Sequence, residues 1–109
     1  MLRSFILTAA AVLLVANVAG AQDKVARGQA VYAEQKCSLC HSIAGKGNVK
    51  GPLDEVGTKL NAADLKAWVV DAKGMTVKTK STRKPDMKNY VLPDADVDAL
   101  VAYMQTLKK

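Results

Sequence analysis

The residues best suited to chemistry lie together at positions 37–41, where the sequence reads Cys-Ser-Leu-Cys-His. If this stretch forms a helical turn, Cys37, Cys40 and His41 stand at i, i+3 and i+4 and project to one side. Two thiols and an imidazole so arranged suit a dithiol redox site, a metal site, a disulfide or the covalent attachment of haem through its two vinyl groups. The rest of the sequence decides among these four.

Three of the four receive no support elsewhere in the chain. A thioredoxin-like C-x-x-C is typical of a βαβ unit, and no strand is predicted before Cys37. Structural zinc needs four protein ligands, whereas the chain has two cysteines and one histidine in all. A Cys37–Cys40 disulfide closes a loop too short to stabilise much and leaves His41 without a role. The pattern therefore favours one covalently bound haem, with Cys37 and Cys40 as thioethers and His41 as an axial iron ligand.

Residues 1–21 are predicted to be a cleaved secretory signal peptide. A short basic start at Arg3 precedes an almost wholly apolar run of about 15 residues, and Ala19-Gly20-Ala21 provides an A-x-A cleavage site. An uncleaved anchor helix is the alternative, but a run of this length is short for a membrane span. We expect a single domain, residues 22–109, located in the periplasm and not membrane-spanning after cleavage.

Three helices are predicted in that domain, at about 23–36, 62–73 and from 94 nearly to the C-terminus. Each begins at an N-cap candidate, and Gly74 is predicted to end the second. The third helix has apolar residues at i, i+3, i+4, i+7 and i+10, which indicates one buried face. The N-cap candidates are Asp23, Asn61 and Asp94, and the predicted core residues are Leu65, Trp68, Val69, Val97, Leu100, Val101, Met104 and Leu107.

The segments 42–59 and 75–93 are predicted to be loops. The first carries four glycines and a proline, and the second is polar and rich in lysine. Neither is expected to contain a strand pair, so the fold class is all-α with long loops. So much loop is unusual for a domain of this size, which usually needs a disulfide, a metal or a cofactor to stabilise it. Haem would supply that support.

The chain is basic, with 16 Lys and Arg against 10 Asp and Glu. Five of the basic residues fall within 78–88, and no aromatic side chain lies among them to stack on bases, so nucleic acid is not the expected partner. Two interpretations stay open: a solvated loop that keeps the protein soluble, or a docking face for an acidic redox protein. The cluster consists of Lys78, Lys80, Arg83, Lys84 and Lys88.

Residues 24–109 resemble a small bacterial class I c-type cytochrome. The resemblance implies the cytochrome c fold, in which the N- and C-terminal helices cross closely and one middle helix and long loops wrap around a covalently attached haem. A glycine at the crossing lets two helix backbones approach. The matching stretches are Gly28 and Tyr32 before the C-x-x-C-H motif, Gly51-Pro52-Leu53, Trp68-Val69-Val70, 85–90 and 94–104, with Leu100 and Tyr103 at the crossing.

The resemblance also implies three further site residues. The carbonyl of Pro52 would accept a hydrogen bond from the proximal imidazole, Trp68 would pack on the haem, and a methionine from the loop before the last helix would be the second axial ligand. For Pro52 and Trp68, turn formation and simple core packing remain alternatives.

The second axial ligand is predicted to be Met87. Met1 leaves with the signal peptide, and Met104 falls on the apolar face of the last helix. Met87 lies in a polar loop where no packing periodicity accounts for it. Met75 remains the alternative, because Lys88 follows Met87 where many relatives have proline.

Iron held by His41 and a thioether has no open position for substrate. We therefore expect a monomeric one-electron carrier between redox proteins and not an enzyme. The alternatives are a haem-bearing electron-transfer subunit of a larger oxidoreductase and a five-coordinate haem protein that binds peroxide or a small gas.

Overall fold

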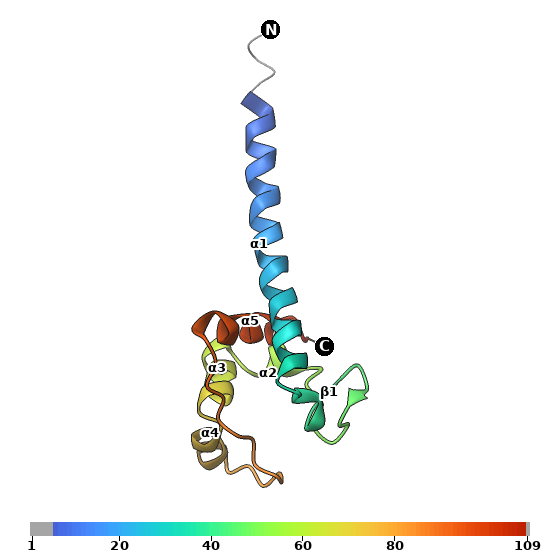
Figure 1. The fold of residues 1–109 in the computed structure, drawn as a ribbon, viewed down its shortest axis with the longest axis vertical. Helices are drawn as coiled ribbons and strands as arrows, with labels where there is room; N and C mark the ends of the chain where they lie inside the picture. The colour runs from blue at the N-terminus through green and yellow to red at the C-terminus, as the bar shows by residue number, and fades with distance from the viewer. Residues whose placement is uncertain (1–5, 109) are drawn as a thin grey trace.

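The structure is a computed structural model that describes residues 6–108, with side chains from Gly20 onwards, and it is mostly helical (Figure 1). The all-α prediction is confirmed, but the prediction that no strands pair is wrong, because β1 and β2 form a short antiparallel hairpin with Ser42 opposite Gly47. The elements are α1 (Ile6–Glu34), the 3-10 turn η1 (Cys37–Leu39), β1 (Ser42–Ile43), β2 (Lys46–Gly47), α2 (Val56–Lys59), α3 (Ala62–Val70), α4 (Ala72–Thr79) and α5 (Asp94–Gln105).

The crossing of α1 with α5 is the main helix contact of the fold, and Figure 1 shows α5 lying across the C-terminal end of α1. Gly28 is buried there, and a Cβ on it would collide with the carbonyl oxygen of Ala99 and lie 2.7 Å from the Cβ of Tyr103. The rings of Tyr32 and Tyr103 meet edge to face, with centroids 6.0 Å apart and planes at 82°. The predicted close crossing is confirmed, and only glycine fits at position 28.

Helix α1 begins much earlier than predicted. It runs from Ile6 without a break through Asp23, which is therefore not an N-cap. The reason is that the preceding residues are rich in alanine, leucine and valine without proline, so the helix continues backwards. The predicted cleavage after Ala21 is not tested by this geometry, and residues 1–5 of the predicted signal peptide lie outside the described part of the chain. Of the helices the structure describes, none combines the length and hydrophobicity needed to cross a bilayer.

The predicted middle helix is two helices. The Asn61 cap is confirmed, since its side chain accepts a hydrogen bond from the amide of Asp64 at 2.8 Å. However, α3 ends at Val70, and Asp71 caps α4 by accepting a hydrogen bond from the amide of Gly74 at 3.2 Å. A Cβ at Gly74 would collide with that carboxylate. Gly74 therefore permits the cap of a new helix and does not end the old one.

The two predicted loops are shorter than expected. The segment 42–59 contains the hairpin and α2, and α4 extends to Thr79, which leaves 80–93 as the irregular segment. Helix α5 begins at Asp94 itself, with Pro93 in the N-cap position. Its buried face is confirmed.

The core lies between α3 and α5. Leu65, Val101 and Met104 are buried together at its centre, so Met104 is core as predicted. Trp68 and Val69 are only half-buried, and Leu107 lies just beyond α5. The half-buried apolar side chains packed against this centre are Tyr32, Ile43, Leu53, Val56, Leu60, Tyr103 and Leu107.

Candidate haem site

The predicted helical turn at the C-x-x-C-H motif is present. After α1 the chain reverses at Lys36, which has a left-handed conformation (φ 56°, ψ 40°), and enters η1. The amides of Cys40 and His41 then donate to the carbonyl of Cys37 at 3.2 and 3.0 Å. Both thiols are free, with Cys37 half-buried and Cys40 exposed. The three side chains therefore come from one turn, as the spacing predicts.

The imidazole of His41 is tied to the following loop. Its Nδ1 lies 3.1 Å from the carbonyl oxygen of Gly51, which also accepts a hydrogen bond from the amide of Ser42 at 3.1 Å. The acceptor is thus one residue earlier than Pro52, the residue implied by the resemblance. Ser42 pairs with Pro52 as a parallel bridge and accepts from the amide of Leu53 at 2.8 Å, and this pairing brings the Gly51 carbonyl beside the ring. With Nδ1 as the donor, Nε2 is the nitrogen left for a metal.

The surroundings of His41 favour the neutral form of its ring. Burial lowers the pKa of His41, the hydrogen bond to Gly51 opposes this, and the positive charge of Arg83 lowers it further. A neutral imidazole is the form that binds a metal. The environment of His41 therefore suits an axial ligand.

The C-x-x-C-H turn is also stabilised by hydrogen bonds from Asn48, a residue that the sequence analysis did not assign to the site. The amide of Asn48 donates to the carbonyls of Ser38 at 3.0 Å and His41 at 2.9 Å, and its side chain donates to that of Leu39 at 3.2 Å. Gly47 (φ 106°) permits this approach, because a Cβ there would collide with the His41 carbonyl. A Gly-Asn pair shortly after the motif is a turn signal that could have indicated this role.

Arg83 also binds the turn. Its guanidinium donates to the carbonyl of Cys40 and lies against Gly51, where a Cβ would collide with it. Arg83 is half-buried, unlike the exposed Lys78, Lys80 and Lys84. Of the predicted basic cluster, Arg83 is therefore a structural residue of the site, which its position in a lysine-rich loop did not reveal.

The segment 87–90 follows Arg83 and carries a lysine and a tyrosine that contact each other. Lys88 and Tyr90 pack together, with Nζ 4.9 Å from the ring centroid. Burial raises the pKa of Tyr90, and the nearby Cys37 and Cys40 raise it further. Arg83 ties segment 80–93 to the turn that carries the cysteines, through its contact with the carbonyl of Cys40.

The two candidate methionine ligands have different surroundings. Met75 is buried within α4, whereas Met87 is half-buried in segment 80–93 beside Lys88. Met87 therefore belongs to the segment that Arg83 binds to the C-x-x-C-H turn, and its role as a ligand stays a prediction. Trp68 is half-buried on α3, where a haem contact also stays a prediction.

The Cys37 thiol is not activated in the way of a redox cysteine. Burial raises the pKa of the Cys37 thiol, Cys40 adds to the rise, and Lys88 opposes it. Reactive redox cysteines have the opposite shift, which favours the thiolate. Within residues 6–108, no three His, Cys, Asp or Glu side chains converge as metal ligands.

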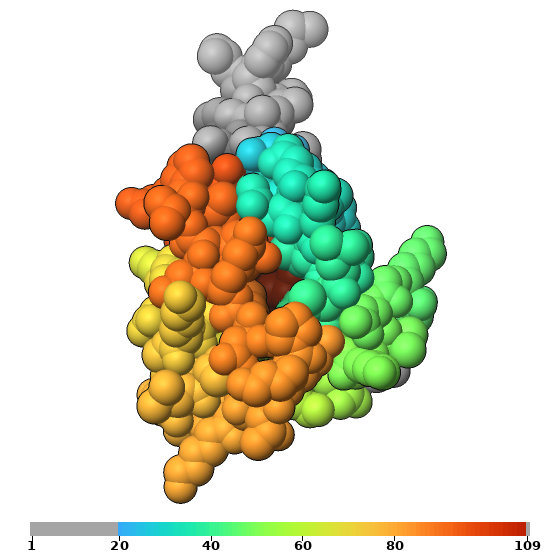
Figure 2. Space-filling view, turned by 60° about the horizontal axis from the view of Figure 1, so that its bottom comes forward, coloured from blue at the N-terminus to red at the C-terminus, as the bar shows by residue number. Residues whose placement is uncertain are grey.

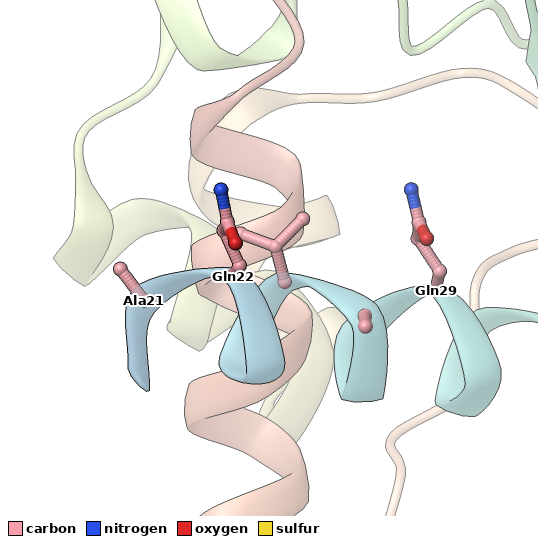
Figure 3. Close-up of a pocket in the computed structure, with 5 residues that line it drawn as sticks. Ala21, Gln22 and Gln29 are labelled. Atoms are coloured by element: carbon pink, nitrogen blue, oxygen red, sulfur yellow. The ribbon is translucent and has the colours of Figure 1, made fainter. Parts of the chain in front are cut away.

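Figure 2 shows a small hollow between the end of α1 with the following turn (teal) and segment 80–93 (orange). Two further depressions are lined by residues outside the C-x-x-C-H motif. One is formed by α1 residues, with Gln22 and Gln29 pointing to the same side of the helix (Figure 3), and the other by residues around α2. The first is lined by neutral residues only, and the second includes two carboxylates and a lysine.

A family model described as cytochrome c matches residues 25–108. The chain belongs to the cytochrome c family. Haem binding and haem-based electron transfer follow from this membership. The resemblance to a c-type cytochrome and the predicted cytochrome c fold are both confirmed.

A curated relative of this cytochrome is the cytochrome c oxidase subunit 2 of Alkalihalophilus pseudofirmus. It is 29% identical over 91 residues, which are 75% of this chain and 25% of the relative. The cytochrome thus spans about a quarter of the length of that protein. No solved structure matches at a significant level.

The residues present fit haem. The cytochrome has two free thiols and an imidazole on one turn, and Nε2 of His41 is free to bind a metal because Nδ1 is hydrogen-bonded. The hollow beside this turn is bounded by segment 80–93. A buried hydroxyl adjoins the site: burial raises the pKa of Tyr32 to about 12, with a contribution from Cys37. Among the described side chains, its Oη is buried without a hydrogen-bond partner.

Proposed function

We propose that this cytochrome is a periplasmic one-electron carrier with a single covalently attached haem. In this proposal Cys37 and Cys40 form the thioethers, and His41 and Met87 are the axial ligands. The observation that carries it is the turn itself, which bears two free thiols and a tethered imidazole and to which Arg83 binds the segment that contains Met87. When bound, the haem supplies reversible one-electron chemistry at its iron.

Each site residue has a defined task in this proposal. The hydrogen bond from His41 to Gly51 fixes the tautomer and orientation of the imidazole and makes it a stronger ligand. Arg83 fastens segment 80–93 to the turn at Cys40. Pro52 shapes the loop beside the ring, and Trp68 contributes an aromatic wall. If His41 and Met87 both held the haem iron, no site would be left for a substrate, so the protein would carry electrons and would not be an enzyme.

The spectrum of the reduced protein under carbon monoxide tests the ligand set. We expect wild type not to bind carbon monoxide, Met87→Ala to bind it and to have a lower reduction potential, and the matched variant Met75→Ala to behave as wild type. If Met75→Ala bound carbon monoxide and Met87→Ala did not, the ligand assignment would be wrong. Binding by wild type itself would favour the five-coordinate alternative.

The mass of the secreted protein tests export and haem content together. We expect residues 22–109 plus one haem. A mass that includes residues 1–21 would favour the uncleaved anchor, and a mass without haem would contradict the proposed function.

A haem-bearing subunit of a larger oxidoreductase is a second candidate. It is favoured by the similarity to an oxidase subunit 2 that is about four times longer than the matched region. Purification from the native source under mild conditions separates the two. A monomer supports the free carrier, whereas a stable complex with a large redox protein supports the subunit.

The partner of the carrier is proposed to be an acidic redox protein that docks on the exposed lysines of segment 78–88. Lys84 is 74% exposed, although it pairs with Asp86 at 2.9 Å, and Lys78, Lys80 and Lys88 are also exposed. Charged faces of this kind steer encounter and are screened by salt beyond about 8 Å at physiological ionic strength.

Charge reversal tests this docking face. Lys84→Glu with Lys88→Glu should slow electron transfer to an acidic partner, most strongly at low salt. The matched control reverses two exposed lysines elsewhere, Lys24 and Lys108, and changes net charge equally. If both pairs slow transfer equally, the effect is one of net charge, and segment 78–88 is a solubility feature.

A further inference from the structure

The proposed Met87 ligand lies between two anchors of segment 80–93. The first is Arg83, which binds the C-x-x-C-H turn at Cys40. The second is formed by the two residues before Val91: the side chain Oδ1 of Asn89 accepts from the amide of Lys73 at 2.9 Å, and the amide of Tyr90 donates to the carbonyl of Val69 at 2.9 Å.

The second anchor reaches the junction of α3 and α4. Val69 lies near the end of α3, and Lys73 lies in the first turn of α4. The amides in the first turn of a helix have no partner within that helix. The side chain of Asp71 accepts a hydrogen bond from the amide of Gly74, and that of Asn89 accepts one from the amide of Lys73. The cap of α4 is therefore completed by a residue from a distant loop.

Asn89 is distinctive among its neighbours. Of the described side chains in 84–93, it is the one that hydrogen-bonds outside the segment, since Lys84 pairs with Asp86 and Lys88 packs on Tyr90. The backbone adds the bond from the amide of Tyr90 and, at the end of the stretch, the carbonyl of Pro93, which accepts from the amides of Asp96 and Val97. The side chain two positions after Met87 therefore fixes where this part of the loop lies relative to α3 and α4.

We propose that Asn89 is the positioning residue for the Met87 thioether, an inference that rests on the proposed role of Met87 as a ligand. Holding the loop in one conformation reduces the entropy lost each time the thioether returns to the iron. Without the Asn89 bond, the conformations in which Met87 lies away from the site become more populated. An external ligand that competes with Met87 then binds more tightly, because its apparent affinity scales with the fraction of protein in the open form.

The test is imidazole binding to the oxidised holoprotein in three variants. Asn89→Ala should bind imidazole about fivefold more tightly than wild type, the effect expected from one lost hydrogen bond. Asn89→Asp keeps an acceptor for the Lys73 amide and should restore wild-type affinity to within about twofold. The amide of Lys73 should exchange faster in Asn89→Ala and return to slow exchange in Asn89→Asp.

Asn61→Ala is the matched control. Asn61 also caps a helix with Oδ1, at the start of α3, but it does not touch segment 80–93 through that bond. It should lower thermal stability about as much as Asn89→Ala while leaving imidazole affinity unchanged. If Asn89→Ala lowers stability and also leaves the affinity unchanged, Asn89 is only a helix cap and the inference is overturned.

Met87→Ala separates failure of this inference from failure of the proposed ligand. A strong rise in imidazole affinity in Met87→Ala, together with no rise in Asn89→Ala, overturns the role of Asn89 alone. If Met87→Ala leaves the affinity unchanged, Met87 is not the competing ligand, and both proposals are wrong.

Discussion

The crossing of α1 with α5 is held by interlocking side chains. Gly28 lets the two backbones touch, the rings of Tyr32 and Tyr103 meet edge to face, and Arg27 spans the helices to Asp96 with two contacts of 3.0 and 3.1 Å. Packing, geometry and charge all act at the same place. The crossing therefore has little freedom to rearrange in parts.

Segment 80–93, by contrast, is held at a few points. Its described residues form no helix or strand, and between the backbone hydrogen bonds at its two ends its hydrogen bonds to the rest of the fold come from Arg83, Asn89 and the amide of Tyr90. Val91 is 99% exposed. Few buried contacts make a region open at low free energy.

The difference teaches where a cytochrome of this size places its stability and its chemistry. The packing of α1 on α5 forms the stable part of the fold, called the frame below, and it fixes the position of the C-x-x-C-H turn that follows α1. The segment supplies the proposed second ligand and most of the lysines of the proposed docking face, and it can adjust because few contacts hold it.

Amide hydrogen exchange should show the largest contrast between the two regions. We expect the amides of residues 25–34 and of α5 to exchange only through global unfolding. Those of 81–92 should exchange through local openings that cost about 5 kcal/mol less. Equal opening free energies in the two regions would mean that the segment unfolds with the frame, and the comparison would not hold.

Gly28→Ala attacks the crossing directly. The new Cβ meets the carbonyl of Ala99, so the helices must separate, and we expect unfolding in denaturant to cost about 3 kcal/mol less. Gln29→Ala, at the exposed neighbouring position, should change stability little. A stable Gly28→Ala variant would show that the helices can shift at small cost.

Asp96→Asn probes the charge pair at the crossing. The Arg27 guanidinium, which donates hydrogen bonds to Asp96, holds the pKa of that carboxyl below its ordinary value. The resulting stability is present above the unfolded-state pKa, near 3.9, and is lost as pH falls through the lowered pKa. Wild type should therefore exceed Asp96→Asn in stability at pH 7, and the gap should close towards pH 2.

Denaturant titrations at several pH values measure this gap. Glu34→Gln is the control: it removes the other carboxylate near Arg27, whose side chain is 52% exposed against 20% for Asp96, and its effect should be smaller. A gap that stays constant with pH would show that shape, not charge, accounts for the effect of Asp96→Asn.

Tyr32→Phe should have the smallest effect. It keeps the ring that packs on Tyr103 and removes a buried hydroxyl without a partner among the described residues. We expect stability to stay the same or rise by up to about 1 kcal/mol, as measured by thermal unfolding. A clear loss would reveal a hydrogen bond from this hydroxyl in the haem-bound protein.

The sequence predicted features that depend on local pattern. The periodicity from Val97 to Met104 gave the buried face of α5, and Asn61 was correctly identified as a cap because its side chain acts within one turn. The spacing of Cys37, Cys40 and His41 needs only a helical turn, and a turn forms. Gly28 was recognised from the resemblance and confirmed by its contacts.

Features that depend on distant partners were missed. A glycine at position 74 is typical of a helix end, but in the structure its lack of a Cβ leaves room for the carboxylate of Asp71, which caps α4. Arg83 and Asn89 look like ordinary loop residues, and only the folded chain brings them to Cys40 and Lys73. The hydrogen-bond acceptor for His41 is the carbonyl of Gly51 and not that of Pro52, because the backbone bridge between Ser42 and Pro52 determines which carbonyl lies beside the ring.

That bridge also limits how the length of the chain can vary. Ser42, only 2% exposed, is paired to Gly47 on one side and to Pro52 on the other, and these backbone pairings depend on the count of residues between them. An insertion or deletion within 43–51 would carry a different carbonyl to His41, even if every side chain were kept. Substitution in this stretch is therefore tolerated more easily than a change in its length, whereas the exposed turn near Lys80 can lengthen without moving the imidazole.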